Sequence, residues 1–243
     1  MELFSVHPKI YEFDELQSFV KEFAIGKGEL VLTNRCILSE KDRLLMDECS
    51  VLFQEKYGRG EPSDRMVAGI RSASAGQDFC RVIAIGGETV LDIAKLLVLP
   101  YDVPIEDLCE PDAVFEKTRE LILVLTTCGI GSEMTNISIV TLTQKNVKQG
   151  LIFNNLYADA AVRIPTFIDA LPYKPFAASL INALIHGVES NLSPSATDYR
   201  QILSSQTMER ILLGIRRMKG NGEKARYRQS KNFLRASNLA PCL

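Results

Sequence analysis

Two adjacent glycines, Gly86 and Gly87, stand where an apolar run gives way to helical spacing in RVIAIGGETVLDIAK. The run 81–85 predicts a buried strand, and the spacing over 89–99 predicts a helix. Backbone N–H groups in such a turn and the positive end of the helix suit a pyrophosphate, because glycine has no Cβ to block its approach. Thr89 adds a hydroxyl donor. An ordinary strand-to-helix turn explains the spacing equally well, since two glycines are weaker than a full dinucleotide fingerprint.

A second polar loop ends the apolar run 121–126 in LTTCGIGSEMTN. Thr126 and Thr127 are followed there by two glycines and a serine, a concentration of hydroxyls and glycines that favours a polar ligand at a sheet edge. Asp92, in the first turns of the preceding predicted helix, joins them as a candidate binding residue. Cys128 lies in the same loop, and we interpret it as a small buried filler rather than a reactive thiol.

Asn182 and His186 are four residues apart in the predicted helix 176–192, so both side chains lie on one face. An amide oxygen and an imidazole on one face could bind the same metal ion. A solvated polar face explains the same pattern, with apolar residues at spacings of four, from Phe176 to Val188, forming a separate stripe of the helix. The residues alone favour the solvated face.

Strand and helix patterns alternate through the first half of the chain, which predicts a parallel sheet flanked by helices. Ser39 and Ser63 are predicted helix caps. Helices are expected over 13–23, from Ser39 to about 56, and from Ser63 to about 71. Strands are expected over 29–33, 81–85 and 121–126, with strands around a polar turn within 137–153.

Helical periodicity takes over from about Pro172 and continues through 176–192 and 204–218, with no strand candidate after it. The predicted fold class is therefore α/β, with a doubly wound, Rossmann-like parallel sheet followed by the start of an all-helical domain. We place the dinucleotide-binding domain at 1–164 and the partial helical domain, for metal and substrate, at 165–243.

The composition narrows the classes of partner. Lys and Arg number 28 and Asp and Glu number 30, giving a net charge of −2 with no long run of either sign, so nucleic acid is not expected. No window supplies the roughly 18 apolar residues of a membrane span. The first residues lack the apolar core of a signal peptide, and the six cysteines form no C-x-x-C pair. We expect a cytoplasmic protein with reduced thiols and a small-molecule ligand.

Three segments in order resemble the signatures of one family: IGGETVLDIAK, TTCGIGSEMTN and FAASLINALIHGVESNLSP. They are similar to GGGS-x-x-D-x-AK, TT-x-GTGSE and the DAL-x-H-x-x-E helix of the iron-containing (group III) alcohol dehydrogenases, whose architecture is that of dehydroquinate synthase. The resemblance runs to about Ala240. It implies hydride exchange between an alcohol and NAD, aided by Fe²⁺ as a Lewis acid. GEPSDRM also fits the branch that interconverts 4-hydroxybutyrate and succinate semialdehyde.

The resemblance assigns cofactor roles to individual residues. The pyrophosphate would be held by Gly86, Gly87 and Thr89, and Thr126 and Thr127 would lie along the cofactor. Lys148 matches the family's cofactor-contacting lysine. Asn34 stands where NAD-preferring members often have an acidic residue. Without that carboxylate the repulsion of a 2′-phosphate is lost, so NAD is the implied cofactor and NADP stays open.

The candidate metal site departs from the family pattern of one aspartate and three histidines. His186 matches a histidine, but Asn182 places a neutral amide where the family has a carboxylate, which hard cations prefer. The sequence holds two histidines, His7 and His186, and KNFLRASNLAPCL resembles the helix that leads to the missing ones. We therefore expect a truncated chain that does not retain Fe²⁺ and that exposes apolar surface on helix 176–192.

Two further departures concern the cofactor. Glu88 replaces the third glycine of GGGS and brings a negative charge toward a pyrophosphate, and Ile130 replaces a threonine. We expect weak nucleotide binding with Glu88 as an impediment. Three functions stay open: an NAD(P)-dependent dehydrogenase of 4-hydroxybutyrate or another short alcohol, a catalytically silent nucleotide-binding fragment or partner of a full-length subunit, and a lyase of the dehydroquinate synthase type. A homo-oligomer is also left open.

Overall fold

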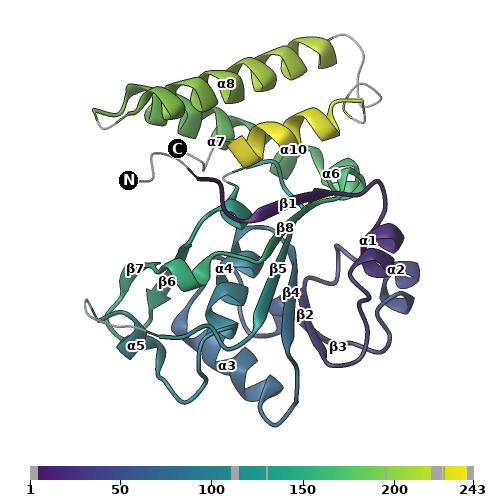
Figure 1. The fold of residues 1–243 in the computed structure, drawn as a ribbon, viewed down its shortest axis with the longest axis vertical. Helices are drawn as coiled ribbons and strands as arrows, with labels where there is room; N and C mark the ends of the chain where they lie inside the picture. The colour runs from purple at the N-terminus through teal and green to yellow at the C-terminus, as the bar shows by residue number, and fades with distance from the viewer. Residues whose placement is uncertain are drawn as a thin grey trace.

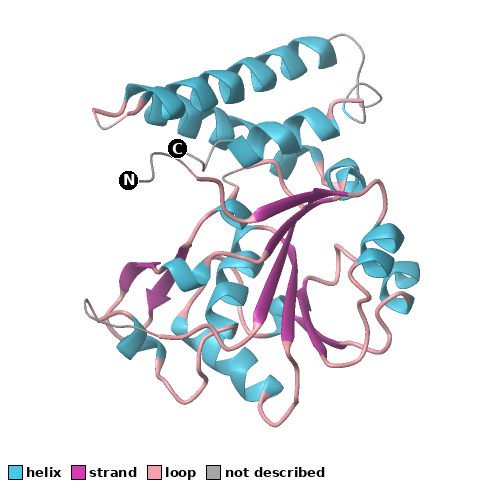
Figure 2. Cartoon of the chain, viewed as in Figure 1, coloured by secondary structure: helices cyan, strands magenta, loops and turns pink. Residues whose placement is uncertain are grey.

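The computed structural model describes residues 5–110, 115–129, 131–194, 196–219, 226 and 228–239. A twisted sheet with its covering helices forms one layer, and the long C-terminal helices form a second layer beside it (Figure 1). Every strand of the described residues belongs to the first layer, as the magenta arrows of Figure 2 show.

The main sheet has six parallel strands in the order β1-β8-β5-β4-β2-β3. The central strands are apolar runs buried on both faces, which is the pattern expected of a parallel sheet covered on two sides. The bounds are β1 (Lys9–Glu12), β2 (Glu29–Thr33), β3 (Ser50–Phe53), β4 (Arg81–Gly86), β5 (Glu120–Leu125) and β8 (Ala160–Arg163).

Two apolar cores cover the opposite faces of this sheet. One joins α3 (Asp64–Ser74), α4 (Glu88–Leu97) and α5 (Ile105–Leu108) to the antiparallel hairpin of β6 (Ile137–Leu142) and β7 (Val147–Ile152). The other packs α1 (Leu16–Glu22) and the residues flanking the short α2 (Glu40–Leu44). The chain therefore leaves β2 toward one face and β4 toward the other. Such a switch point opens a crevice at the carboxyl ends of the two strands, where doubly wound folds bind ligands.

The helical layer comprises α6 (Pro165–Ala170), α7 (Tyr173–Leu192), α8 (Asp198–Met218) and α10 (Ser230–Leu239), and it lies over the carboxyl ends of the strands (Figure 1). α8 packs against α7 and α10. Gly214 permits the second contact, because a Cβ there would overlap the Phe233 ring. Among the described residues, no helix combines the length and apolarity needed to cross a bilayer.

Most predicted elements are confirmed. The strand over 29–33 has the predicted bounds, β4 and β5 lie within one residue of theirs, and the hairpin turns at the polar residues following β6. Ser39 and Ser63 both cap helices, accepting hydrogen bonds from the backbone N–H groups of Asp42 and Met66. The last strand ends at Arg163, and α6 begins at Pro165.

The predicted helix from Ser39 to about residue 56 is wrong. α2 ends at Leu44, and Ser50–Phe53 forms β3, an edge strand paired with β2. β-branched and aromatic side chains in SVLF favour a strand, and pairing with β2 supplies the long-range partner that local spacing does not reveal. β1 and β8 were not predicted for a similar reason, since each is four residues long and is defined by its neighbours in the sheet.

Candidate nucleotide-binding site

The crevice between β2 and β4 brings together two of the predicted segments. Thr33, the last residue of β2, donates its hydroxyl to the carbonyl of Ile85 at 2.8 Å, which holds the ends of the two strands together. Asn34 follows directly on one side and the Gly86-Gly87 turn on the other. α4 starts at Glu88, and no side chain of the described residues caps it. The first backbone N–H groups of α4 therefore face the crevice mouth without a side-chain acceptor.

Different features of the structure explain why positions 86 and 87 are glycine. A Cβ on Gly86 would come within 2.5 Å of Val90 Cβ, so this glycine lets α4 pack closely against the strand. Gly87 has φ −82° and ψ −177°, a conformation open to any residue, and its Cβ would approach nothing closer than Thr127 Cγ2 at 3.6 Å. Neither backbone geometry nor packing within the described protein requires Gly87. Its missing side chain leaves open space beside the helix terminus.

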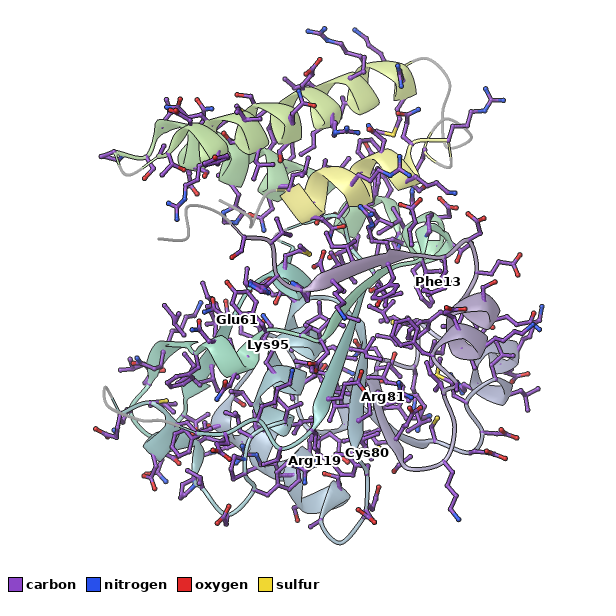
Figure 3. All side chains as sticks on the ribbon, viewed as in Figure 1. Phe13, Glu61, Cys80, Arg81, Lys95 and Arg119 are labelled. Carbon is purple, nitrogen blue, oxygen red and sulfur yellow. The ribbon has the colours of Figure 1, made fainter. Side chains whose placement is uncertain are left out.

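Thr89 and Lys148 both contact the loop 60–61. The Thr89 hydroxyl donates to the Gly60 carbonyl at 3.1 Å, and Lys148 Nζ on β7 lies 2.6 Å from the Glu61 carboxylate. Figure 3 labels Glu61 on the side of the molecule where Lys95 lies, well away from Arg81 at the other end of the sheet. The Lys148–Glu61 pair is exposed, so both groups remain available to a ligand.

Asp92 belongs to a buried polar network rather than to the surface of the crevice. Its carboxylate accepts hydrogen bonds from the Ser132 hydroxyl at 2.5 Å and from the Ile139 N–H at 3.1 Å. Lys95 Nζ, which is fully buried, donates to Ser132 and to Thr135 at 3.0 and 3.1 Å. It also donates to the Ile137 carbonyl at 2.6 Å. The Asp and Lys of VLDIAK thus fasten the glycine-rich loop and the hairpin to α4.

The loop after β5 returns to the crevice. Thr126 is buried and donates its N–H to the Gly86 carbonyl at 3.0 Å, while the half-buried Thr127 faces Gly87. Gly131 has φ +72°, a left-handed conformation that other residues adopt only at a cost, so this glycine is needed for the turn itself.

Glu133, at the end of the same loop, has no exposed surface. Burial raises the pKa of its carboxyl to about 7. Oε1 accepts a hydrogen bond from Asn238 on α10, and Oε2 has no hydrogen-bond partner among the described residues. The side chain therefore links the loop to the helical layer.

A cavity of about 220 Å³ lies between the α/β layer and α7. Glu88 and Thr127 line it from one side, and Ser179 and Asn182 line it from α7. Partial burial and the neighbouring Asp92 carboxylate raise the pKa of Glu88. Cys128 is buried behind the cavity, as predicted, with Sγ 3.1 Å from Ser179 Oγ. Burial raises its pKa to about 11, so the thiol stays protonated and unreactive near neutral pH.

Asn182 and His186 lie on one side of α7, but their surroundings differ. Asn182 is half-buried at the cavity, whereas the His186 side chain is 38% exposed and lies 3.6 Å from the Glu189 carboxylate. Within the described ranges, no group of three or more His, Cys, Asp or Glu side chains could hold a metal ion together. One imidazole and one neutral amide do not make a fitting ligand set for iron.

The end of β2 carries one feature that the sequence did not reveal. Asn34 Nδ2 donates to Glu55 Oε2 at 3.0 Å and to Gln54 Oε1 at 3.2 Å, and the Arg35 N–H donates to Glu55 Oε1 at 3.0 Å. Glu55 comes from the short turn after β3. A carboxylate therefore lies beside Asn34 although the sequence places none at the carboxyl end of β2.

Comparison with known proteins identifies this arrangement. Residues 9–165 match the profile of the family described as iron-containing alcohol dehydrogenase. The chain belongs to that family. Its Gly86-Gly87 turn, its Thr126-Thr127 loop and the Asp92–Lys95 network therefore lie in the α/β portion of an iron-containing alcohol dehydrogenase, and the helices from α6 onward begin the second portion.

Individual relatives agree with the family assignment. 4-Hydroxybutyrate dehydrogenase from Clostridium kluyveri is 41% identical over 240 residues, which cover 99% of this chain and 65% of the relative. Sulfoacetaldehyde reductase from Bilophila wadsworthia is 32% identical over 161 residues, covering 65% of this chain and 41% of that protein. The chain thus spans less than two thirds of the length of either relative.

Solved structures show the same fold. Sulfoacetaldehyde reductase from Bifidobacterium kashiwanohense, in complex with NAD⁺, superposes with a TM-score of 0.82 at 18% identity and covers 99% of this chain, which matches 66% of that one. The iron-containing alcohol dehydrogenase of Thermotoga maritima gives a TM-score of 0.79 at 23% identity, over 98% of this chain and 68% of its own.

Proposed function

We propose that this chain binds NAD(H) in the crevice between β2 and β4 and forms the nucleotide-binding part of an alcohol dehydrogenase. The observation that carries the proposal is Gly87. Its side chain is absent although neither its backbone angles nor its packing requires a glycine, and the open space adjoins the uncapped start of α4. A pyrophosphate fits that combination of space and backbone donors.

The surrounding residues fit the rest of such a ligand. Thr127 borders Gly87, and Thr89 adds a hydroxyl on the first turn of α4. Lys148 offers a cation at the rim, paired with Glu61 until a phosphate competes for it. Asp92 contributes indirectly, because its hydrogen bonds to Ser132 and Ile139 fix the loop after β5, which carries Thr127, and the hairpin, which carries Lys148. When bound, the nicotinamide ring would accept a hydride from the alcohol carbon.

The substrate class is inferred from similarity to related enzymes and not from the shape of a substrate pocket. Membership of the family implies an alcohol or aldehyde substrate, and the similarity to 4-hydroxybutyrate dehydrogenase favours oxidation of 4-hydroxybutyrate to succinate semialdehyde. Among the described residues, Asn182 and His186 do not supply a fitting iron site. That observation favours a second candidate for the chain as it stands: a nucleotide-binding fragment without turnover of its own.

Titration calorimetry with NADH on the 243-residue chain tests the proposal. Gly87→Val fills the open space, and we expect it to weaken NADH binding by at least roughly tenfold, about 1.4 kcal/mol. Its free energy of unfolding should change little, because Gly87 lies at a tolerant φ and has no close neighbour. Ala68→Val, on the exposed side of α3, adds bulk away from the crevice and serves as the control. Equal NADH affinity in both variants would contradict the proposal.

A further inference from the structure

We infer that Glu55 supplies the carboxylate that selects NAD over NADP, in place of the acidic residue missing from the end of β2. This inference rests on the proposed function, because it assigns a residue to the ribose end of the same nucleotide. Glu55 is 21 positions beyond Asn34 in the sequence, and the pairing of β2 with β3 brings the two together.

The geometry fixes the Glu55 carboxylate at the end of β2. Oε1 accepts the Arg35 N–H and Oε2 accepts Asn34 Nδ2, each at 3.0 Å. Each carboxylate oxygen has a second lone pair, so both can still accept a hydroxyl donor. In doubly wound folds the ribose hydroxyls of NAD lie at this strand end and donate to an acidic side chain. Glu55 therefore presents the required acceptor from the neighbouring strand.

The charge of this carboxylate is secured by the same contacts. Partial burial opposes ionisation, but the hydrogen bonds from Arg35 and Asn34 outweigh it and hold the pKa of Glu55 below its ordinary value. The group is therefore anionic near neutral pH. A 2′-phosphate brought to the same place would meet a fixed like charge. This repulsion disfavours NADP more strongly than it weakens the binding of NAD.

Three cations near Glu55 would favour NADP instead. Arg35, Arg43 and Lys56 all lie over the Phe53 ring, with charged groups 5.1, 5.4 and 5.6 Å from its centroid. Cations of this kind bind a 2′-phosphate in NADP-dependent folds. Their charged groups lie over the Phe53 ring at the end of β3, however, whereas the Glu55 oxygens accept hydrogen bonds directly from the Arg35 backbone N–H and the Asn34 side chain at the end of β2. We expect the carboxylate to dominate at the ribose.

The test measures dissociation constants for NADH and NADPH by fluorescence titration of the 243-residue chain. We expect the unaltered chain to bind NADH at least about tenfold more tightly than NADPH. Glu55→Gln keeps the size of the side chain, removes the charge and replaces one acceptor oxygen with an N–H donor group, and it should bring the two constants within about threefold, chiefly by tightening NADPH. Asn34→Asp in the Glu55→Gln background returns a carboxylate to the same place and should restore the preference. Glu40→Gln, exposed on α2, is the matched control.

The outcomes separate the two proposals. Binding of both nucleotides with no preference, or with a preference for NADPH, would overturn the role of Glu55 while leaving nucleotide binding intact. An NADH preference that survives Glu55→Gln would also overturn it. If the unaltered chain binds neither nucleotide, the proposed function fails and the inference fails with it. Circular dichroism melting of each variant shows whether a change in affinity reflects loss of fold.

Discussion

The motif residues of the α/β layer and those of the helical layer differ in how firmly the surrounding protein holds them. In the α/β layer, Asp92 and Lys95 are buried and bonded to the loop and hairpin around them, so the fold itself fixes the crevice. In the helical layer, Asn182 and His186 lie beside exposed apolar positions of α7, which include Ile181 and Ile185. Pre-arranged groups can bind a ligand without reorganising, whereas ligands on a half-covered helix need further protein to complete the site.

The helical layer exposes several large apolar side chains. Along the apolar stripe of α7, Phe176 and Leu180 are buried, Leu184 is half-buried and Val188 is exposed. α8 and α10 cover a different stripe, which includes Ala183 and Gly187. The exposed apolar side chains of α7 and α8 are Tyr173, Ile181, Ile185, Val188, Leu192, Tyr199, Ile202, Leu212 and Leu213. The predicted exposed apolar surface is confirmed, and a patch of this kind favours association with another surface.

The largest expected difference between the two layers is that the chain binds nucleotide but neither retains metal nor turns over substrate. We expect the 243-residue chain to bind nucleotide yet to retain no stoichiometric iron and to leave 4-hydroxybutyrate unoxidised, since Asn182 and His186 leave most coordination positions to water. Anaerobic purification with ferrous iron, metal quantification and an NADH-linked assay measure this. The Clostridium kluyveri enzyme is the control for the assay. Near one iron per chain together with turnover would overturn the prediction.

Breaking the buried Asp92–Lys95 network should greatly lower the folding stability of the chain. Lys95→Met removes the buried cation and leaves the Asp92 carboxylate without it, and breaking such a pair typically costs about 3–5 kcal/mol of folding free energy. Urea denaturation measures the change. Lys41→Met, exposed on α2, is the matched control and should stay within about 0.5 kcal/mol of the unaltered chain. Equal losses in both variants would show that Lys95 does not hold the loop.

The buried Glu133 predicts a pH dependence of stability. Its pKa of about 7 lies above the ordinary value of 4.5, so the folded chain holds this proton more tightly than the unfolded chain. The stabilisation is full below about pH 4.5 and is lost as pH rises to 7, for a change on the order of 3 kcal/mol. Glu133→Gln cannot titrate. Its stability relative to the unaltered chain should rise between pH 5 and pH 8 in denaturation experiments, and a constant difference would count against the buried carboxyl.

A smaller effect is expected at the mouth of the crevice. Glu88 lies in the first turn of α4 and lines the cavity with Thr127, so its charge opposes a nearby phosphate. Glu88→Gly should tighten NADH binding about fivefold, roughly 1 kcal/mol, as followed by titration calorimetry. Glu88→Gln separates charge from flexibility and should reproduce most of the gain. Unchanged or weaker binding in both variants would show that Glu88 points away from the phosphates.

The sequence predicted the parts of the fold that local patterns determine. Buried strands such as β4 and the serine caps of α2 and α3 follow from apolar runs and short-range hydrogen bonds. β3 and β8 depend on partners far along the chain, which no local spacing reports. In the site, the two-glycine turn was visible as a motif, but the distinct roles of Gly86 and Gly87 required the position of Val90. Glu55 had no signal at all, because only the pairing of β2 and β3 places it beside Asn34.

The pairing of β1 with β8 has a consequence for synthesis on the ribosome. Lys9 pairs with Ala160, so the first strand made has no neighbour in the sheet until the last strand has been translated. At roughly 5–20 residues per second, that interval is on the order of 8–30 s. During this time β1 and the edge of β5 that will pair with β8 stay open to chaperones or to another nascent chain. A ribosome-bound nascent chain arrested before β8 should therefore be far more sensitive to protease within β1 than one arrested after α6.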